Sequence, residues 1–200
     1  ALTRRYLDSH FGERSPARFV ALVGDAELDE GNVWEAIADS ATEGLGNFMM
    51  VIDVNRQSLD RVIPDIAADR LKRFFADAGW HVAEAKYGRR LTESFAQPGG
   101  SALEAHIDAM PNEAYQELFG LNAADARRKF LVNASAGVQQ FTNSLDDIKL
   151  QELVTDLGGH DLGVLVDTFR ACYAEPKHPS VALAYHVKCH GLPSRSPPCA

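Results

Sequence analysis

Hard oxygen ligands follow two apolar segments of the chain, at a spacing that defines the first candidate site. The apolar run 19–23 leads through Gly24 into Asp25, and the apolar run 48–52 leads into Asp53 and Asn55. Carboxylate and amide oxygens of this kind suit Mg²⁺ or Ca²⁺ rather than a soft metal. Asp and Asn are also common in turns that follow strands. Residue types alone therefore leave a metal site and two polar loops as equal alternatives.

The segments around these residues indicate a parallel sheet. Continuous apolar runs at 18–24 and 47–54 are typical of strands that are buried on both faces, and each is followed by a helical pattern. Parallel strands joined by one crossover helix lie about 4.8 Å apart, and ligands bind beyond their carboxyl ends. Asn55 comes thirty positions after Asp25, the length of one such unit. The two side chains are therefore expected to be neighbours.

The same loop has features of a phosphate site. Gly24 is expected to allow a sharp turn after the strand, and the following N–H groups at Ala26 and Glu27 are expected to point at phosphate oxygens. Mg²⁺ usually completes its coordination shell with water and with the phosphates of its ligand. The residues thus predict a magnesium–diphosphate site.

Further elements complete an α/β pattern of the doubly wound, mostly parallel type. An amphipathic helix is expected at 1–11. The helix predicted within 30–46 has Asn32 as its N-cap and Gly44 or Gly46 as its end. The remaining predicted elements are a helix at 65–79, a strand at 80–88, a helix at 162–173 and a strand at 180–187.

The chain is expected to form one domain over residues 1–190, followed by an irregular tail at 191–200. Strand signals are absent between about 89 and 150, where short helical patterns indicate an inserted helical region. Because the chain starts without Met and already within a helical pattern, we expect it to be a piece of a longer protein.

Composition excludes several classes of function. A net charge of −8 argues against non-specific binding to nucleic acid or to an anionic membrane surface. The longest apolar run, FMMVI, is far too short to span a bilayer. The three cysteines form neither a close pair nor a disulfide framework, so a reducing, cytoplasmic setting is the simplest interpretation.

Several stretches resemble one family. GDAELDEGN, followed by VIDVNRQSLD, resembles the thiamine-diphosphate signature, which runs from Gly-Asp-Gly to an Asn about thirty residues later. The chain is similar to the homodimeric bacterial pyruvate dehydrogenases, the decarboxylating components of that complex, within the transketolase-like superfamily. The resemblance covers nearly the whole chain and continues through RLKRFFADAGWHVAEAKYG, HIDAMPNEAYQELFG, LGGHD and AYHVKCHGLP, in that order.

This resemblance implies roles for particular residues. Its magnesium ligands are the carboxylate of Asp25, the side-chain oxygen of Asn55 and the backbone carbonyl of Gln57. Its cofactor-binding residues are Gly24, Asp25, Ala26, Glu27, Asp53 and Asn55.

Two positions depart from the family pattern. Ala26 stands where a third glycine is usual, which costs little unless its φ is positive. Asp53 replaces an Asn common in close relatives and adds negative charge near the diphosphate, for which Arg56 is a candidate compensating group.

The implied activity is the decarboxylation of a 2-oxo acid, with pyruvate the expected one, by thiamine diphosphate and Mg²⁺. The acyl unit then passes to a lipoyl group on an acyltransferase subunit, and the enzyme is a homodimer. The carboxylate that activates the aminopyrimidine lies outside these residues, so the chain alone is expected to be catalytically incomplete. The alternatives are a transketolase that moves two-carbon ketol units between sugar phosphates, and a binding module without activity.

Two further residues, His160 and Lys188, are candidates for catalytic contacts. The pair His160-Asp161, in the segment GGHD, is either a polar contact near the site or a cap for the helix that follows, and the cap is the favoured interpretation because Asp precedes an apolar helical pattern. Lys188 comes after the last predicted strand, and the resemblance suggests that it is near the substrate channel. A solvated charge at the rim of the sheet is an equal alternative for Lys188.

Overall fold

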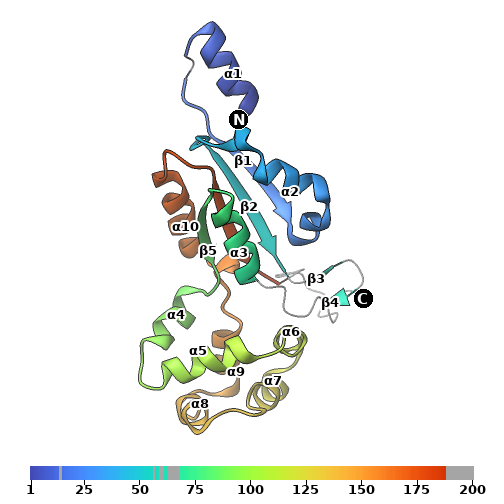
Figure 1. The fold of residues 1–200 in the computed structure, drawn as a ribbon. Coiled ribbons are helices and arrows are strands. Elements are labelled where there is room, and N and C mark those ends of the chain that lie inside the picture. The colour runs from blue at the N-terminus through green and yellow to red at the C-terminus, as the bar shows by residue number, and fades with distance from the viewer. Residues whose placement is uncertain (14, 56, 59–60, 63–67, 188–200) are drawn as a thin grey trace. The chain divides into compact units, whose positions relative to one another are not determined.

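The computed structural model describes residues 1–13, 15–55, 57–58, 61–62 and 68–187. Contacts divide the chain into two units, which Figure 1 shows in ribbon form. The first unit contains Ala1–Val54, Ile66–Ala85 and Gly163–Ala184, and the second contains Asn55–Asp65, Lys86–Leu162 and Tyr185–Ala200. Where the sequence predicts one domain over 1–190, the contacts separate a sheet unit from a helical unit.

The sheet unit is an α/β arrangement with strand order β1-β2-β6-β5, and all four strands are parallel. The predicted fold class is confirmed. The elements of this unit are α1 (Leu2–Phe11), β1 (Phe19–Gly24), the 3₁₀ helix η1 (Asp25–Asp29), α2 (Gly31–Ala38), the 3₁₀ helix η2 (Ser40–Thr42), β2 (Phe48–Val54), α3 (Ala68–Asp77), β5 (His81–Ala85), α10 (Leu162–Ala174) and β6 (Ser180–Tyr185).

Helices α2 and α3 pack on one face of the sheet. The indole N–H of Trp80 donates to the carbonyl of Ile37 over 3.0 Å, which joins the end of α2 to the residue before β5. The rings of Phe75 and Phe48 lie 5.4 Å and 5.6 Å from the ring of Trp80. Phe75, Trp80 and Ile37 are almost fully buried, so this aromatic cluster forms the core under α2 and α3.

Helix α10 covers the other face. Cys172 packs against Met49 and Val51 of β2 and Ala182 of β6, and all four are buried. Burial raises the pKa of the Cys172 thiol to about 11, so the thiol of this core residue stays protonated at neutral pH. Helices on both faces are what a doubly wound sheet requires.

Strand β1 differs from the expectation that it is buried on both faces. The side chains of Val20 and Leu22 are 53% and 75% exposed. Among the described strands β1 is at the edge of the sheet, with β2 as its one neighbour. The sequence pattern identified the strand correctly but gave the wrong burial, because an apolar run does not reveal the order of strands in a sheet.

Helix α2 is shorter than expected and Asn32 is not its N-cap. The helix begins at Gly31, with Glu30 as the capping residue, and it ends at Ala38. The carboxylate of Asp39 accepts a hydrogen bond from the N–H of Ala41 over 2.8 Å. This side-chain contact starts η2 and ends α2 well before Gly44.

The second unit is mainly helical, as predicted for 89–150. Its elements are the short strands β3 (Gln57–Ser58) and β4 (Arg61–Val62), the helices α4 (Arg89–Phe95), α5 (Gly100–Ala109), α6 (Asn112–Gly120), α7 (Ala123–Phe130), α8 (Ala136–Thr142) and α9 (Asp147–Val154), and the 3₁₀ helix η3 (Gly158–His160). Its core consists of Leu91, Leu103, Ile107, Tyr115, Leu118, Ala126, Phe130, Val138, Leu150, Val154 and Leu157.

The predicted tail 191–200 lies outside the described residues. Within the described residues, no helix is long and apolar enough to cross a membrane.

Candidate functional site

The two strand ends that carry the predicted ligands lie side by side. In the parallel pair of β1 and β2, Gly24 is in register with Asp53. Asp25 follows Gly24 directly and is half-buried at the start of η1. The prediction that the two strand ends lie close together is thus confirmed for Gly24 and Asp53. Both residues lie at the carboxyl ends of their strands, where ligands of parallel sheets bind.

Gly24 is not needed for a sharp turn, contrary to the expectation. Its φ of −73° and ψ of 152° are extended values that any residue adopts. A Cβ atom built at Gly24 would have no other heavy atom within 4 Å. The glycine therefore leaves open space at the strand end, where another group can approach the backbone closely.

The loop after Gly24 is a single 3₁₀ helix. Leu28 anchors it in the core with 4% of its surface exposed, and the carboxylate of Glu27 accepts a hydrogen bond from the N–H of Gly24 over 3.2 Å. The first N–H groups of such a helix have no carbonyl partner within the helix. Ala26 is in this first turn and, unlike Asn133, it has no positive φ, so alanine is accommodated there without strain.

A cavity of 560 Å³ in the sheet unit includes Glu27 in its wall. Its other lining residues are mostly apolar, among them Val23, Ile37 and Trp80. The described charged side chains at its wall are the carboxylates of Glu27 and Asp39. An apolar cavity with acidic groups does not suit a diphosphate, which leaves the strand ends as the better candidate for such an anion.

Asn55 and Gln57 belong to the helical unit and are described within it. The backbone carbonyl of Asn55 accepts a hydrogen bond from the side-chain amide of Gln116 over 2.9 Å. Gln57 opens β3 and pairs with Val62 of β4. Arg56, the candidate compensating charge, lies outside the described residues.

No group of three or more His, Cys, Asp or Glu side chains gathers as a metal centre in the part of the chain that the structure describes. The predicted magnesium ligands are of another kind, because they include one carboxylate, one amide oxygen and one backbone carbonyl. Such a set depends on phosphate and water oxygens to complete its shell.

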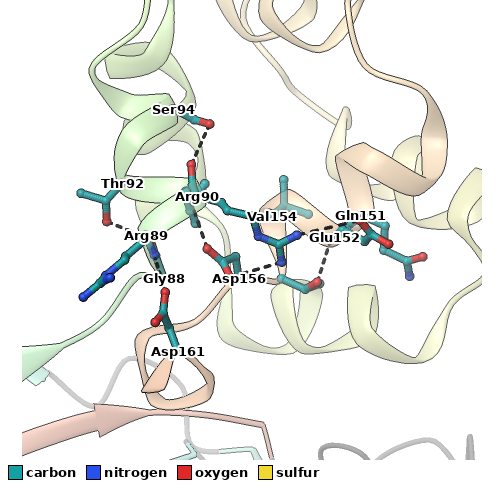
Figure 2. Close-up of polar contacts among 12 residues, drawn as sticks. Gly88, Arg89, Arg90, Thr92, Ser94, Gln151, Glu152, Val154, Asp156 and Asp161 are labelled. Carbon is teal, nitrogen blue, oxygen red and sulfur yellow. Dashed lines mark hydrogen bonds and ion pairs between the residues drawn. The ribbon is translucent and has the colours of Figure 1, made fainter. Parts of the chain in front are cut away.

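Two aspartates of the helical unit contact the start of helix α4, as Figure 2 shows. The carboxylate of Asp156 accepts from the N–H of Leu91 over 3.2 Å and forms an ion pair with Arg90 at 3.4 Å. The carboxylate of Asp161 accepts from the N–H of Arg89 over 2.9 Å. Both carboxylates therefore contact the first turn of α4, where negative charge is favourable.

Asp161 immediately precedes α10, where the sequence predicts a cap, and its contact with α4 was not foreseen. Sequence reasoning also missed Asp156 and Gln116. Gln116 and Asn55 are 61 positions apart, so no local pattern points to their contact. The position of Asp156 two residues before a Gly-Gly pair is a weak signal of a polar turn.

His160 is half-buried in η3. Its Nε2 accepts a hydrogen bond from the N–H of Val187 over 2.9 Å, and its ring centroid lies 6.0 Å from that of His186. Lys188, the other candidate for a catalytic contact, lies outside the described residues.

Comparisons with known proteins identify relatives of this chain. Residues 8–97 match the family model described as transketolase, thiamine diphosphate binding domain. The pyruvate dehydrogenase E1 component of Corynebacterium glutamicum is 26% identical over 191 residues, which cover 94% of this chain and 20% of that protein.

Two further relatives carry the same description. That of Pseudomonas aeruginosa is 27% identical over 193 residues, with 95% of this chain and 22% of that protein covered. That of Escherichia coli K12 is 26% identical over 192 residues, with 94% and 21% covered. The resemblance expected from the sequence is confirmed, and the chain spans about a fifth of the length of these relatives.

Proposed function

We propose that this chain, which carries a transketolase-type thiamine diphosphate binding domain homologous to pyruvate dehydrogenase E1 components, holds the Mg²⁺–diphosphate part of that cofactor. The observation that carries the proposal is the register of Gly24 with Asp53, which brings the two halves of the signature together at one edge of the sheet.

The proposed ligands of Mg²⁺ are the carboxylate of Asp25, the side-chain oxygen of Asn55 and the backbone carbonyl of Gln57. Asn55 follows Asp53 by two residues, and the hydrogen bond from Gln116 holds its backbone carbonyl. These oxygen ligands are of the type that Mg²⁺ prefers, and the metal would offset the repulsion between Asp25 and a diphosphate.

The diphosphate itself is proposed to contact the N–H groups of Ala26 and Glu27 in the first turn of η1. The open space beside Gly24 allows the anion to approach the backbone, and the absence of a positive φ at Ala26 preserves the turn. When bound, thiamine diphosphate supplies the electron sink that decarboxylation requires.

The activity of the whole protein is a further part of the proposal. By similarity, it decarboxylates pyruvate and passes the acyl unit to a lipoyl group on an acyltransferase subunit, as a cytoplasmic homodimer. On this proposal the present chain supplies the diphosphate half of the site, and the group that activates the aminopyrimidine comes from elsewhere.

Asp25→Ala tests the site directly. Removing the only carboxylate of the proposed ligand set should weaken Mg²⁺-dependent binding of thiamine diphosphate on the order of 100-fold or more, because even outer partners of metal sites contribute tenfold or more. Isothermal titration calorimetry with thiamine diphosphate in MgCl₂ and in EDTA measures this. Asp29→Ala is the matched control, since Asp29 is an exposed carboxylate of the same 3₁₀ helix.

Equal affinities for the wild-type chain and the Asp25→Ala variant would refute the assignment of the ligands. Absence of binding to the wild-type chain would favour the alternative of an inert module. The description of the matching family also names transketolase. Assays of a longer protein that contains this chain, with pyruvate and an electron acceptor or with pentose phosphates, separate the two activities.

A further inference from the structure

The side-chain amide of Gln116 fixes the backbone of Asn55. Its Nε2 donates to the carbonyl oxygen of Asn55 over 2.9 Å, and Gln116 is only 9% exposed. Burying an amide N–H without an acceptor costs free energy, so this side chain is expected to keep its contact with the carbonyl. Both residues belong to the helical unit, and 61 positions separate them in the sequence. The contact therefore reflects the tertiary fold of this unit and not a local turn.

The helix α6, which carries Gln116, is itself held at several points. The hydroxyl of Tyr115 donates to the carbonyl of Val154 over 2.6 Å in the buried core. Near the end of α6, the side-chain amide of Gln151 donates to the carbonyl of Leu118 over 2.8 Å, and the side chain of Leu118 is fully buried. Gln116 therefore projects from a rigid base, which a residue that positions a ligand requires.

Asn55 is constrained on both sides of its Cα atom. Val54 before it is the last residue of β2, and the carbonyl after it is the one that Gln116 holds. The side chain of Asn55 leaves the same Cα atom, so these two constraints set the direction in which the side chain is presented. A ligand has to be held within about 0.5 Å of its productive position, and a fixed backbone is a precondition for this.

We propose that Gln116 is a positioning residue for Mg²⁺, which sets the backbone of Asn55 so that the side-chain oxygen of Asn55 is presented to the metal. The role of Asn55 as a ligand rests on the proposed function, whereas the hydrogen bond from Gln116 does not. Removal of a partner that orients a metal ligand typically costs about 10-fold to 100-fold in metal affinity. The affinity for Mg²⁺ should therefore depend on Gln116, although this residue is outside the proposed ligand set.

The test compares two substitutions of Gln116 in the 200-residue chain. Gln116→Met keeps the length of the side chain and has no donor, whereas Gln116→His keeps an N–H at a similar distance from the backbone. Isothermal titration calorimetry with Mg²⁺, at a fixed excess of thiamine diphosphate, gives the dissociation constant of the metal. We expect this constant to rise about tenfold or more in Gln116→Met and to return close to the wild-type value in Gln116→His.

Tyr115→Phe is the matched control on the same helix. It removes the hydrogen bond to Val154 and does not alter the groups that join Gln116 to Asn55. We expect this variant to lose stability and to keep the wild-type affinity for Mg²⁺. Urea unfolding without the cofactor shows whether each variant is folded. The comparison separates a positioning effect of Gln116 from a general loss of stability, which would weaken binding in the control as well.

Equal dissociation constants of Mg²⁺ for the wild-type chain and Gln116→Met would overturn the proposal. A loss of affinity in Gln116→His or in Tyr115→Phe as large as that in Gln116→Met would also overturn it, because the donor at Gln116 would then not be the cause. A failure of the proposed function looks different, since the wild-type chain itself would then show no Mg²⁺-dependent binding of thiamine diphosphate, and both proposals would fall. Loss of binding in Asp25→Ala with unchanged binding in Gln116→Met would remove only the role of Gln116.

Discussion

At the scale of single residues, adjacent side chains of α6 secure two distant parts of the helical unit. The hydroxyl of Tyr115 donates to the carbonyl of Val154, at the end of α9, over 2.6 Å in the buried core. The next residue, Gln116, holds the backbone of Asn55. The Tyr-Gln pair of the segment NEAYQ thus has a structural reason, since one residue stabilises the core and the other anchors a predicted magnesium ligand.

We predict that Tyr115→Phe lowers the free energy of unfolding by about 1–2 kcal/mol, because it leaves the buried carbonyl of Val154 without its donor. Urea unfolding followed by circular dichroism measures the change. Tyr6→Phe is the control, since Tyr6 is 57% exposed on α1 and its hydroxyl is not needed in the core. A loss in Tyr115→Phe no larger than in the control would contradict this account.

The sequence predicted which residues lie at the candidate site better than it predicted their backbone conformations. Spacing alone was enough to place Asp25 and Asp53 at neighbouring strand ends, because one crossover has a nearly fixed length. It did not show that Gly24 is extended, since residue type restricts φ without determining it. The sequence also could not show that the side-chain amide of Gln116 donates a hydrogen bond to the carbonyl of Asn55, because this contact depends on how the helical unit folds.

At the scale of elements, close helix contacts depend on small residues. A Cβ atom built at Gly100, the first residue of α5, would lie 2.2 Å from the carbonyl oxygen of Ser94 and 2.3 Å from that of Phe95. At Gly120, the last residue of α6, nothing lies within 4 Å of such an atom. The two glycines therefore have different roles, although both stand at the end of a helix.

We predict that Gly100→Ala lowers the free energy of unfolding by about 1–3 kcal/mol, because the added methyl group overpacks the contact of α4 with α5. Gly120→Ala should change it by less than about 1 kcal/mol, in the stabilising direction, because alanine reduces the freedom of the unfolded chain. Chemical denaturation of both variants gives the comparison. Similar losses in the two variants would show that the contact at Gly100 is not tight.

Helices and strands with a clear apolar periodicity were predicted well, whereas the ends of helices and the burial of strand side chains were predicted less well. The strands β2, β5 and β6 and the helix α10 follow from apolar runs and helical spacing. The early end of α2 depends on one side-chain contact of Asp39, and the exposure of β1 depends on its place in the sheet. Neither is encoded in a local pattern.

At the scale of the whole molecule, the helical region 86–162 closes on itself. Its first residues contact its last ones through the hydrogen bond between Gly158 and Lys86, the bond between Gly88 and Asp156 and the ion pair of Arg90 with Asp156. Every buried residue of its core cluster comes from within 86–162. The two ends of this helical region therefore lie side by side.

We predict that the isolated fragment 86–162 folds, with a helical circular dichroism spectrum and a cooperative urea transition, because its core and the contact of its ends are internal. The same fragment with Leu118→Asp is the control. Leu118 is fully buried, so a charge there should abolish the transition. A wild-type fragment without a transition would show instead that the helical region needs the sheet unit in order to fold.

The exposed side of β1 bears on how the chain behaves when it is prepared at high concentration. An edge strand is a template on which a further strand can pair, and the usual protective features are charged side chains or proline. On its outer face β1 presents Val20 and Leu22 instead. A strand that paired at this edge would bond to the backbone of β1, whereas only an element packed on the face of the sheet would bury both side chains. Because the edge strand β1 has no charged residue or proline, pairing with a strand of another chain, and aggregation through that pairing, is expected at high concentration.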